Sequence, residues 1–391
     1  MTLGWLPMGA AADPAGAAPS ARRPEIVPAQ PLCVEDYHEL ARHRVSADVW
    51  DFVEGGAEAE LTVAANRHAL DRVRLRPRVL VDVSTCVTDT TVLGVRVGTP
   101  LGVAPIAYHR LVHPDGEVGT ARGAGTAGAL CVVSIFASRS LEEIAEAATG
   151  PLWLQLYWLR RREVLTQLVK RAEAAGYRAV VLTVDAPRMG RRMRDLRNGF
   201  AVDPAIAAVN LDPELMASAH RGRAGESALA VHSAETFDQS VTWRDLAWLR
   251  EQTELPLVLK GILTAEDAVR AVEHGVDAIV VSNHGGRQLD RAVASLDALP
   301  EVVDAVAGAC PVLFDGGVRR GSDAFIALAL GASAVLVGRP VLWALAADGG
   351  AGVADLLRLL NDELAHTMAL GGRPTLADID RTALAWPPPA R

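Results

Sequence analysis

The chain has 391 residues, of which half are hydrophobic and 22% are charged. This composition is typical of a globular protein and excludes a chain that is disordered throughout. The 39 basic and 47 acidic residues give a net charge of −8, which offers no general attraction to nucleic acid or to anionic lipid.

The four cysteines, Cys33, Cys86, Cys131 and Cys310, are too few and too scattered for a disulfide framework or a Cys-x-x-Cys metal clip. We therefore expect no metal site and a reducing, cytoplasmic location. The N-terminal segment lacks the basic region that precedes the apolar stretch of a secretory signal. No run of about 18 apolar residues indicates a membrane span, so we expect no membrane partner.

The two ends of the chain have little hydrophobic periodicity. Residues 1–31, rich in alanine and proline, are predicted to be a disordered or loosely attached arm, and the tail, 376–391, is interpreted in the same way from its sequence LAWPPPAR. The main domain is expected to span 32–375. Its first part, up to about residue 100, contains an amphipathic helical segment, then DFVEGGAEAE and a short β-rich region, which we expect at one end of the central fold or over its mouth.

From about residue 100 onward, eight short apolar runs alternate with longer helical patterns. The runs are LGVAPI from Leu101, CVVS from Cys131, LWLQLY from Leu152, AVVLTVD from Ala179, LVLK from Leu257, DAIVVS from Asp277, PVLFDG from Pro311 and SAVLVG from Ser333. Continuous apolar runs of this length indicate parallel strands that are buried on both faces. Eight such units in about 240 residues predict an α/β protein with a closed (β/α)₈ TIM barrel, because an open doubly wound sheet usually has fewer strands.

One connection departs from this pattern. Between the fourth and fifth strands lies an insert from about Arg197 to Ser240 with little regular pattern. A loop this long is usually a lid, a binding loop or a disordered segment. Because it mixes acidic and basic side chains and has no long apolar face, we expect a mobile lid and not a membrane anchor.

The active face of a barrel is built from the C-terminal ends of its strands and the loops that follow them. At these ends the sequence has a set of polar residues and one glycine: Ser134, Gln155, Tyr157, Thr183, Asp185, Lys260, Ser282, His284, Asp315, Gly338 and Arg339. A random distribution would scatter polar residues along the strands, so this clustering indicates a functional site.

The last two units contain DGGVRRG at 315–321 and VGRP at 337–340, in the loops where barrels commonly bind phosphate. Glycines such as Gly317 expose backbone N–H groups, and a helix that starts at Pro340 adds its dipole. Arg319 and Arg339 add charge-assisted hydrogen bonds. The two loops together predict a phosphate site.

After the sixth strand, the segment SNHGGRQLD at 282–290 places an imidazole and a guanidinium on one tight loop. His284 is suited to remove a proton from a substrate whose carboxylate Arg287 holds. A lone histidine is more often structural than catalytic, so both interpretations of His284 stay open at this point. Asp185, at the end of the fourth strand, is placed to pair with His284 and raise its basicity.

The basic segment PRMGRRMRDLRNGF at 187–200 follows the fourth strand, at the mouth of the predicted barrel. In an acidic chain this position favours anion binding inside a site over a nucleic-acid patch, with a solvated helix face as the alternative. We therefore expect no nucleic-acid partner.

Taken together, these motifs resemble the FMN-dependent 2-hydroxy-acid oxidase and dehydrogenase family, which includes glycolate oxidase, lactate oxidase and mandelate dehydrogenase. The matching segments are GVAPIAYHRLVHPDGE, WLQLYWLRRRE, LTVDAPRMGRRMRDLRNGF, LKGILTAEDA, VVSNHGGRQLD, DGGVRRGSD and ALALGASAVLVGRPV. AYHRLVHP, LQLYW and RDLRNGFAV are most similar to the 4-hydroxymandelate oxidase branch. The resemblance implies FMN as cofactor, a small 2-hydroxy acid as substrate and a homotetramer.

For the cofactor, the resemblance implies that Lys260 lies by the N1 and O2 edge of the flavin. It further implies that Ser134, Gln155 and Thr183 hydrogen-bond the ring and that Pro105, Ile106 and Ala107 line its N5 side. Ser282 would also lie at the cofactor. The ribityl chain and phosphate would be bound by Asp315, Gly317, Arg319, Gly338 and Arg339.

For the substrate, the resemblance implies that His284 is the base, supported by Asp185. Tyr157 would contact the reacting hydroxyl, while Arg192 and Arg287 would bind the carboxylate. His284 accepts a proton whether hydrogen leaves the substrate as a hydride or as a proton with a carbanion, and the sequence leaves both routes open.

One departure from the family pattern affects the substrate. Phe52, in WDFVEGGA, stands where the short-chain oxidases usually have a tyrosine, and Phe136 replaces a common tryptophan. Tyr108 and Met189 are also expected to face the pocket. The lost hydroxyl makes the pocket more apolar and leaves the carboxylate to the two arginines.

We therefore expect an FMN enzyme that oxidises an (S)-2-hydroxy acid, with an aryl group as in mandelate or 4-hydroxymandelate, to the 2-oxo acid, with O₂ reoxidising the flavin to give H₂O₂. Three alternatives remain at this stage. They are a dehydrogenase of a small aliphatic 2-hydroxy acid that passes electrons to a quinone or carrier protein, a non-redox FMN-barrel isomerase, and a flavin-binding protein without catalysis.

Overall fold

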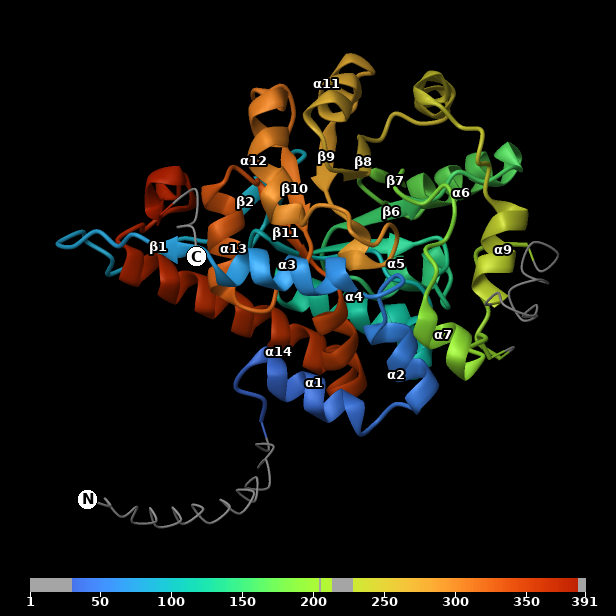
Figure 1. The fold of residues 1–391 in the computed structure, drawn as a ribbon, viewed down its shortest axis with the longest axis horizontal. Coiled ribbons are helices and arrows are strands. Elements are labelled where there is room, and N and C mark those ends of the chain that lie inside the picture. Colours follow the sequence, from blue (N-terminus) through green and yellow to red (C-terminus); the bar gives the residue numbers. More distant parts are fainter. Residues whose placement is uncertain (1–29, 204, 213–227, 386–391) are drawn as a thin grey trace, which may run out of the picture.

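The computed structural model describes residues 30–203, 205–212 and 228–385. Its central strands are β4 (Leu101–Val103), β5 (Leu130–Ser134), β6 (Leu152–Leu156), β7 (Val180–Thr183), β8 (Leu257–Ile262), β9 (Ala278–Val281), β10 (Val312–Asp315) and β11 (Ala334–Val337). They are parallel and form a closed barrel in the order β10-β11-β4-β5-β6-β7-β8-β9 (Figure 1). All eight predicted strands are present, and the predicted (β/α)₈ barrel is confirmed.

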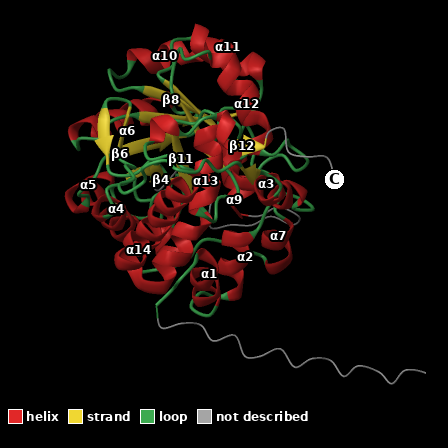
Figure 2. Ribbon diagram, turned by 90° about the vertical axis from the view of Figure 1, so that its left-hand side faces the viewer, coloured by secondary structure: helices red, strands yellow, loops and turns green. Residues whose placement is uncertain are grey.

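Helices surround this barrel on the outside (Figure 2). They are α4 (Gly116–Thr126), α5 (Leu141–Ala147), α6 (Arg162–Ala174), α10 (Leu246–Glu251), α11 (Ala265–Glu273), α12 (Ser295–Val306), α13 (Gly321–Ala329) and α14 (Arg339–Gly371). In α6 the buried residues Leu165, Leu168 and Ala172 recur at helical spacing and pack inward. Short 3₁₀ turns are η1 (His109–Leu111), η2 (Trp243–Asp245), η3 (His284–Gly286), η4 (Leu376–Asp378) and η5 (Arg381–Ala383).

The long helix α14 is interrupted by non-helical backbone at Asp348 and Gly349. Among the described helices it alone is long and apolar enough to cross a membrane, but 78% of its most apolar window is buried inside the protein. The helix packs against α4 and α13. We therefore interpret it as a core helix of the barrel domain.

The N-terminal part of the domain covers both ends of the barrel. It comprises α1 (Val34–Arg42), α2 (Ala47–Glu54), α3 (Leu61–Asp71), β1 (Arg74–Leu75), β2 (Thr90–Val92) and β3 (Val95–Val97). Val92 and Val97 of the β2–β3 hairpin pack on the side chains inside the barrel and close its N-terminal end. At the opposite end, α2 lies beside α7 (Met193–Asn198) and contributes Phe52 to the active face.

Alternate side chains of each strand point into the barrel. Leu130 and Val132 of β5 and Val258 of β8 belong to the interior core, whereas Val133 and Leu259 pack under the helices. Continuing the inward alternation along each strand by two residues reaches Ser134, Gln155, Thr183, Lys260, Ser282, Asp315 and Gly338. The predicted set of polar strand ends is therefore mainly the uppermost interior layer of the barrel.

Two regions differ from the sequence prediction. Leu384–Ala385, placed in a loose tail, forms β12 and pairs antiparallel with β1, because two apolar residues can complete a short sheet there. The insert after the fourth barrel strand contains the helix α9 (Ala228–Thr236), which its weak pattern did not predict. Residues 1–29 of the predicted arm, 386–391 of the tail, and 204 and 213–227 of the insert lie outside the described residues, so a mobile lid remains a prediction.

Candidate active site

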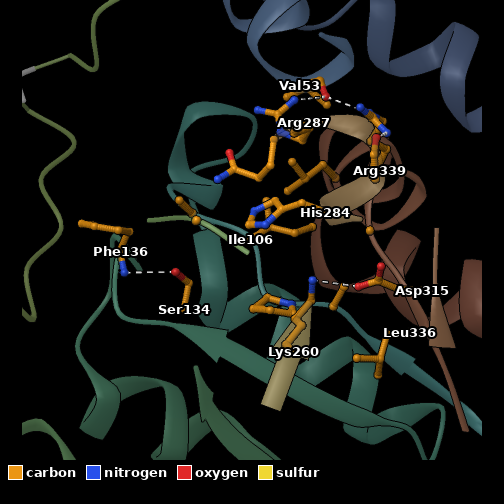
Figure 3. A pocket seen from close by; sticks show the side chains of 18 of the residues that line it. Val53, Ile106, Ser134, Phe136, Lys260, His284, Arg287, Asp315, Leu336 and Arg339 are labelled. Carbon is orange, nitrogen blue, oxygen red and sulfur yellow. Dashed lines mark hydrogen bonds and ion pairs between the residues drawn. The ribbon is translucent and has the colours of Figure 1, made fainter. Parts of the chain in front are cut away.

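A cavity open to solvent lies at the C-terminal ends of the barrel strands, with about 1300 Å³ of space when its open part is included. Figure 3 shows His284 in its middle, Arg287 and Arg339 near the backbone of Val53 on one side, and Lys260 paired with Asp315 on the other. The predicted site residues that line it are Phe52, Pro105, Ile106, Ala107, Tyr108, Ser134, Phe136, Tyr157, Met189, Arg192, Lys260, His284, Arg287, Asp315, Gly317, Arg319, Gly338 and Arg339. The other four, Gln155, Thr183, Asp185 and Ser282, lie outside the lining and contact one another or lining residues.

The imidazole of His284 is held between a carboxylate and a phenol. Its Nδ1 lies 3.0 Å from Oδ1 of Asp185, and its Nε2 lies 3.4 Å from the hydroxyl of Tyr157. The backbone of His284 is left-handed (φ 59°), and its N–H donates to the Ser282 hydroxyl at 3.0 Å. Such backbone strain in a non-glycine residue persists where surrounding contacts enforce it, often at active sites.

Burial and charge set the ionisation of this group. Burial lowers the pKa of His284 below its ordinary value, against the opposing influence of Asp185. For Asp185, burial alone would raise the pKa, but His284 and Lys260 outweigh it and the pKa is lowered. A neutral imidazole whose Nδ1–H donates to Asp185 leaves the Nε2 lone pair free to accept a proton from the cavity.

A glycine in β8 allows Asp185 to approach the strand. Gly261 has φ 112° and lies at a shift in register between Lys260 and Ile262. A Cβ at this position would come within 2.6 Å of the Asp185 Cβ. The bulge therefore makes room for the carboxylate behind His284 while Lys260 still points into the barrel.

Lys260 is the cationic centre of the polar layer. Its Nζ is 3.0 Å from Oδ2 of Asp315 and donates to the Ser282 hydroxyl at 2.7 Å. Nearby in the same layer, the Gln155 amide donates to the Thr183 hydroxyl at 3.0 Å. Oδ1 of Asp315 is buried without a hydrogen-bond partner in the described structure, so it remains available to a ligand hydroxyl.

Two arginines lie at the predicted phosphate loops. The guanidinium of Arg319 lies 4.6 Å from the centre of the Trp343 ring, and burial together with the charge of Arg339 lowers the pKa of Arg319 to about 10. Arg339 donates to the Val53 carbonyl at 3.2 Å and the Gly285 carbonyl at 3.0 Å. Two buried cations that repel each other are stabilised by binding an anion with more than one negative charge, such as a phosphate monoester.

Arg192 and Arg287 approach the ring of Phe52, with guanidinium-to-centroid distances of 5.7 and 5.3 Å. Phe52 in turn stacks on Phe200 with 4.5 Å between ring centres. Burial lowers the pKa of both arginines, and for Arg287 the charge of Arg192 adds to that effect. An incoming carboxylate would relieve this repulsion, as expected at a carboxylate-binding site.

The charge of Arg192 is partly balanced from behind. Its Nη1 lies 3.9 Å from a carboxylate oxygen of Asp195, one turn along α7, and the Asp195 side chain is only 1% exposed. Burial raises the pKa of Asp195, against the opposing charges of Arg192, Arg287 and Arg194. This carboxylate was not predicted as a site residue, because in the sequence Asp195 is one of several charged residues in a basic segment and nothing sets it apart.

Aromatic rings form the wall beyond His284. The centre of the Phe136 ring lies 5.7 Å from that of Tyr157, 6.2 Å from that of Tyr108 and 5.8 Å from that of His232. Phe237 stacks on Tyr157 at 4.8 Å. The sequence analysis missed His232, Ser233 and Phe237, which come from α9 and the residue after it, because the insert carries no strand-end or glycine-loop signal.

Comparison with known proteins identifies this arrangement. Residues 41–386 match the model of the family described as FMN-dependent dehydrogenase. The chain belongs to this family. FMN is therefore its cofactor, and the match removes the isomerase alternative.

Similar proteins cover nearly the whole chain. The sequence is 50% identical over 341 residues to 4-hydroxymandelate oxidase of Amycolatopsis orientalis, covering 87% of this chain and 94% of that protein. It is 47% identical over 349 residues to glycolate oxidase 3 of Arabidopsis thaliana, covering 89% and 94%. A crystal structure of mandelate oxidase with (S)-4-hydroxymandelic acid has a TM-score of 0.87 and 48% identity, covering 90% of this chain and 98% of that one. The chemistry of the family is FMN-dependent oxidation of 2-hydroxy acids.

Proposed function

We propose that the protein oxidises an (S)-2-hydroxy acid with an aryl side chain, mandelate or 4-hydroxymandelate, to the corresponding 2-oxo acid and uses O₂ as the electron acceptor. The observation that carries this proposal is the aromatic wall of Tyr108, Phe136 and Phe237 beyond His284. Aromatic pairs contribute about 0.5–1.5 kcal/mol beyond buried area, so this wall favours an aryl substrate.

The residues present fit FMN. Arg319 and Arg339 would hold its phosphate together with the backbone of Gly317 and Gly338; a Cβ built at Gly338 meets no atom within 4 Å, so this backbone is open to a ligand. The unpartnered oxygen of Asp315 suits a ribityl hydroxyl. Pro105, Ile106, Ala107 and Ser134 line the cavity where the resemblance puts the flavin ring.

The substrate would bind with its carboxylate between Arg192 and Arg287 and its hydroxyl at Tyr157 and Nε2 of His284. His284 takes the hydroxyl proton, and Asp185 stabilises the imidazolium that forms. When bound, FMN would supply the two-electron chemistry, by which the two electrons and two protons lost by the substrate end on O₂ as H₂O₂. One of those protons is the one that His284 takes. The buried Lys260 places a positive charge near the centre of the barrel mouth, where it would stabilise negative charge on the cofactor.

The relatives include glycolate oxidases as well as 4-hydroxymandelate oxidase, so glycolate is the competing substrate. Phe52 supports the aryl assignment because it places an apolar ring, 6% exposed, against both arginines. A small hydroxy acid would leave the aromatic wall unfilled and would forgo roughly 0.8 kcal/mol for each CH₂ equivalent not buried.

Oxygen consumption and peroxide release, measured with (S)-mandelate, (S)-4-hydroxymandelate, (S)-lactate and glycolate, test this proposal. We expect one peroxide per O₂ consumed and a kcat/KM at least about tenfold higher for the aryl acids. Flavin that is bleached by substrate but reoxidised by a quinone and not by air would instead assign a dehydrogenase.

A further inference from the structure

One polar group in the aromatic wall has no role in the proposed reaction. Tyr108 lines the cavity but is only 2% exposed, and its hydroxyl is buried without a hydrogen-bond partner in the described part of the chain. Leaving a buried hydroxyl without a partner is unfavourable, because the group gives up its hydrogen bonds to water and gains none in return. Native proteins satisfy most such groups, so a lone one in a cavity wall points to a ligand that supplies the partner.

The position of Tyr108 is fixed by its surroundings. Its backbone is left-handed (φ 57°), and its N–H donates to the Phe136 carbonyl at 3.1 Å. A non-glycine residue keeps this conformation only where the neighbouring structure enforces it. The ring is therefore held beside Phe136, with 6.2 Å between the ring centres.

The rings run outward from the reacting end of the cavity. Tyr157 stacks against His284 at 6.4 Å, Phe136 follows Tyr157 at 5.7 Å, and Tyr108 comes next. Tyr108 is thus separated from the base by two aromatic rings. A substrate whose hydroxyl meets His284 would extend its side chain along these rings, away from the arginines that bind its carboxylate.

A second polar group of the wall comes from the insert. Ser233 lines the same cavity, and its hydroxyl donates to the Ala230 carbonyl at 2.9 Å, so its oxygen keeps lone pairs that can accept. The end of α9 is tied to the barrel, because the Arg160 N–H donates to the Thr236 carbonyl and the Asp238 N–H donates to the Trp158 carbonyl, both at 2.9 Å. This part of the insert is therefore a fixed wall.

We propose that the hydroxyl of Tyr108 is a specificity determinant that hydrogen-bonds a phenolic hydroxyl at the far end of an aryl 2-hydroxy acid. This inference rests on the proposed function and deepens it by selecting ring-hydroxylated substrates over plain phenyl ones. A phenol is matched to the site because it both donates and accepts, as the tyrosine hydroxyl does. Burial raises the pKa of Tyr108, which keeps its proton available for donation at neutral pH.

The first test compares Tyr108→Phe with the parent holoenzyme on (S)-mandelate and (S)-4-hydroxymandelate. The substitution removes the hydroxyl and keeps the ring. We expect the ratio of kcat/KM for 4-hydroxymandelate over mandelate to fall about tenfold, since one hydrogen bond to the phenol is lost. An unchanged ratio, or an equal loss on both substrates, overturns the proposal.

Tyr177→Phe is the matched control. Tyr177 is also buried, and its hydroxyl donates to the Leu141 carbonyl at 3.2 Å, but it does not line the cavity. Its removal should leave the ratio unchanged. A fall in the ratio as large as that of Tyr108→Phe would show that the effect is not local and would overturn the assignment.

A binding measurement separates this proposal from the proposed function. Phenylacetate and 4-hydroxyphenylacetate lack the reacting hydroxyl, and their dissociation constants can be measured from the flavin absorbance of the holoenzyme without turnover. We expect the parent to bind 4-hydroxyphenylacetate more tightly and Tyr108→Phe to lose that preference. A parent that binds both equally overturns the Tyr108 proposal, whereas failure to oxidise either mandelate overturns the proposed function alone.

A comparison on the parent alone covers the case in which the variant does not fold. (S)-4-Methylmandelate has nearly the shape of (S)-4-hydroxymandelate but makes no hydrogen bond. We expect the hydroxylated acid to have the higher kcat/KM by about tenfold, because an apolar group would leave the Tyr108 hydroxyl unpaired. Equal or better turnover of the methyl compound overturns the proposal.

Discussion

Nδ1 of His284 lies 3.0 Å from Oδ1 of Asp185, while Nε2 of the same ring faces the hydroxyl of Tyr157 at 3.4 Å. The carboxylate fixes the tautomer in which Nδ1 carries the proton and Nε2 is the base. It also stabilises the imidazolium that forms when the substrate hydroxyl is deprotonated. Because the ring stays neutral at neutral pH, the geometry and the pKa direction point to the same role.

The first prediction concerns pH. Protonation of His284 removes the base, so kcat/KM should be constant at neutral pH and fall as the pH drops through a pKa below the ordinary histidine value of 6.5. Asp185 raises this pKa, so Asp185→Asn should move the acid limb to lower pH and lower the plateau about 10- to 100-fold, since a weaker base remains. The measurement is the pH profile of kcat/KM for the parent and for Asp185→Asn. An acid limb at the same pH in both proteins would show that Asp185 does not influence the pKa of His284.

The second prediction isolates the base. His284→Ala should keep FMN bound, because the substitution removes only the imidazole and leaves Arg319 and Arg339 at the predicted phosphate loops in place. Flavin reduction should slow by at least about 10²- to 10⁴-fold. Flavin content and stopped-flow absorbance measure the two effects separately. Reduction at a near-normal rate would mean that another group takes the proton.

The third prediction tests the carboxylate site. Arg287→Lys should lower kcat/KM by at least about tenfold, because lysine cannot reproduce a bidentate pair with a carboxylate. Arg194→Lys is a suitable control, since Arg194 pairs with Glu60 at 2.6 Å and does not line the cavity. If the two variants behaved alike in steady-state kinetics, the carboxylate would have to bind elsewhere, with Arg192 the first residue to examine.

The fourth prediction concerns Phe52. Phe52→Tyr adds a hydroxyl near Arg192 and Arg287 and makes the pocket less apolar, so selectivity should shift toward lactate and glycolate. The ratio of kcat/KM for (S)-mandelate over glycolate, measured on parent and variant, should fall severalfold. A ratio that rises in the variant would contradict the role given to this ring.

The fold could be predicted where burial dictates composition. Strands such as Val180–Thr183 lie between the barrel interior and the surrounding helices. They must therefore be apolar up to their C-terminal end, as the run AVVLTVD is. The strand Leu384–Ala385 could not be predicted, because two residues beside a proline-rich segment carry no periodic signal. Helix α9 was missed because its nine residues, ALAVHSAET, carry no clear amphipathic period.

The site could be predicted where a residue's place in the barrel determines its role. Lys260 lies near the end of β8 and Asp315 ends β10, and both continue the inward-facing positions of their strands, so their meeting at 3.0 Å follows from the fold. Phe200, Phe237 and His232 lie in or beside the long insert, and their approach to the cavity depends on how that insert folds back on the barrel. Only the three-dimensional structure supplies that information.

The measurement that tests the central claim most directly is anaerobic mixing of the holoenzyme with (S)-mandelate while the flavin absorbance is followed. The account predicts rapid bleaching with formation of phenylglyoxylate, and return of the absorbance with release of H₂O₂ when air is admitted. Glycolate and lactate should bleach the flavin far more slowly at equal concentration. Rapid bleaching of the flavin by glycolate, with no bleaching by (S)-mandelate, would contradict the aryl assignment. A flavin that no 2-hydroxy acid reduces would contradict the proposed reaction itself.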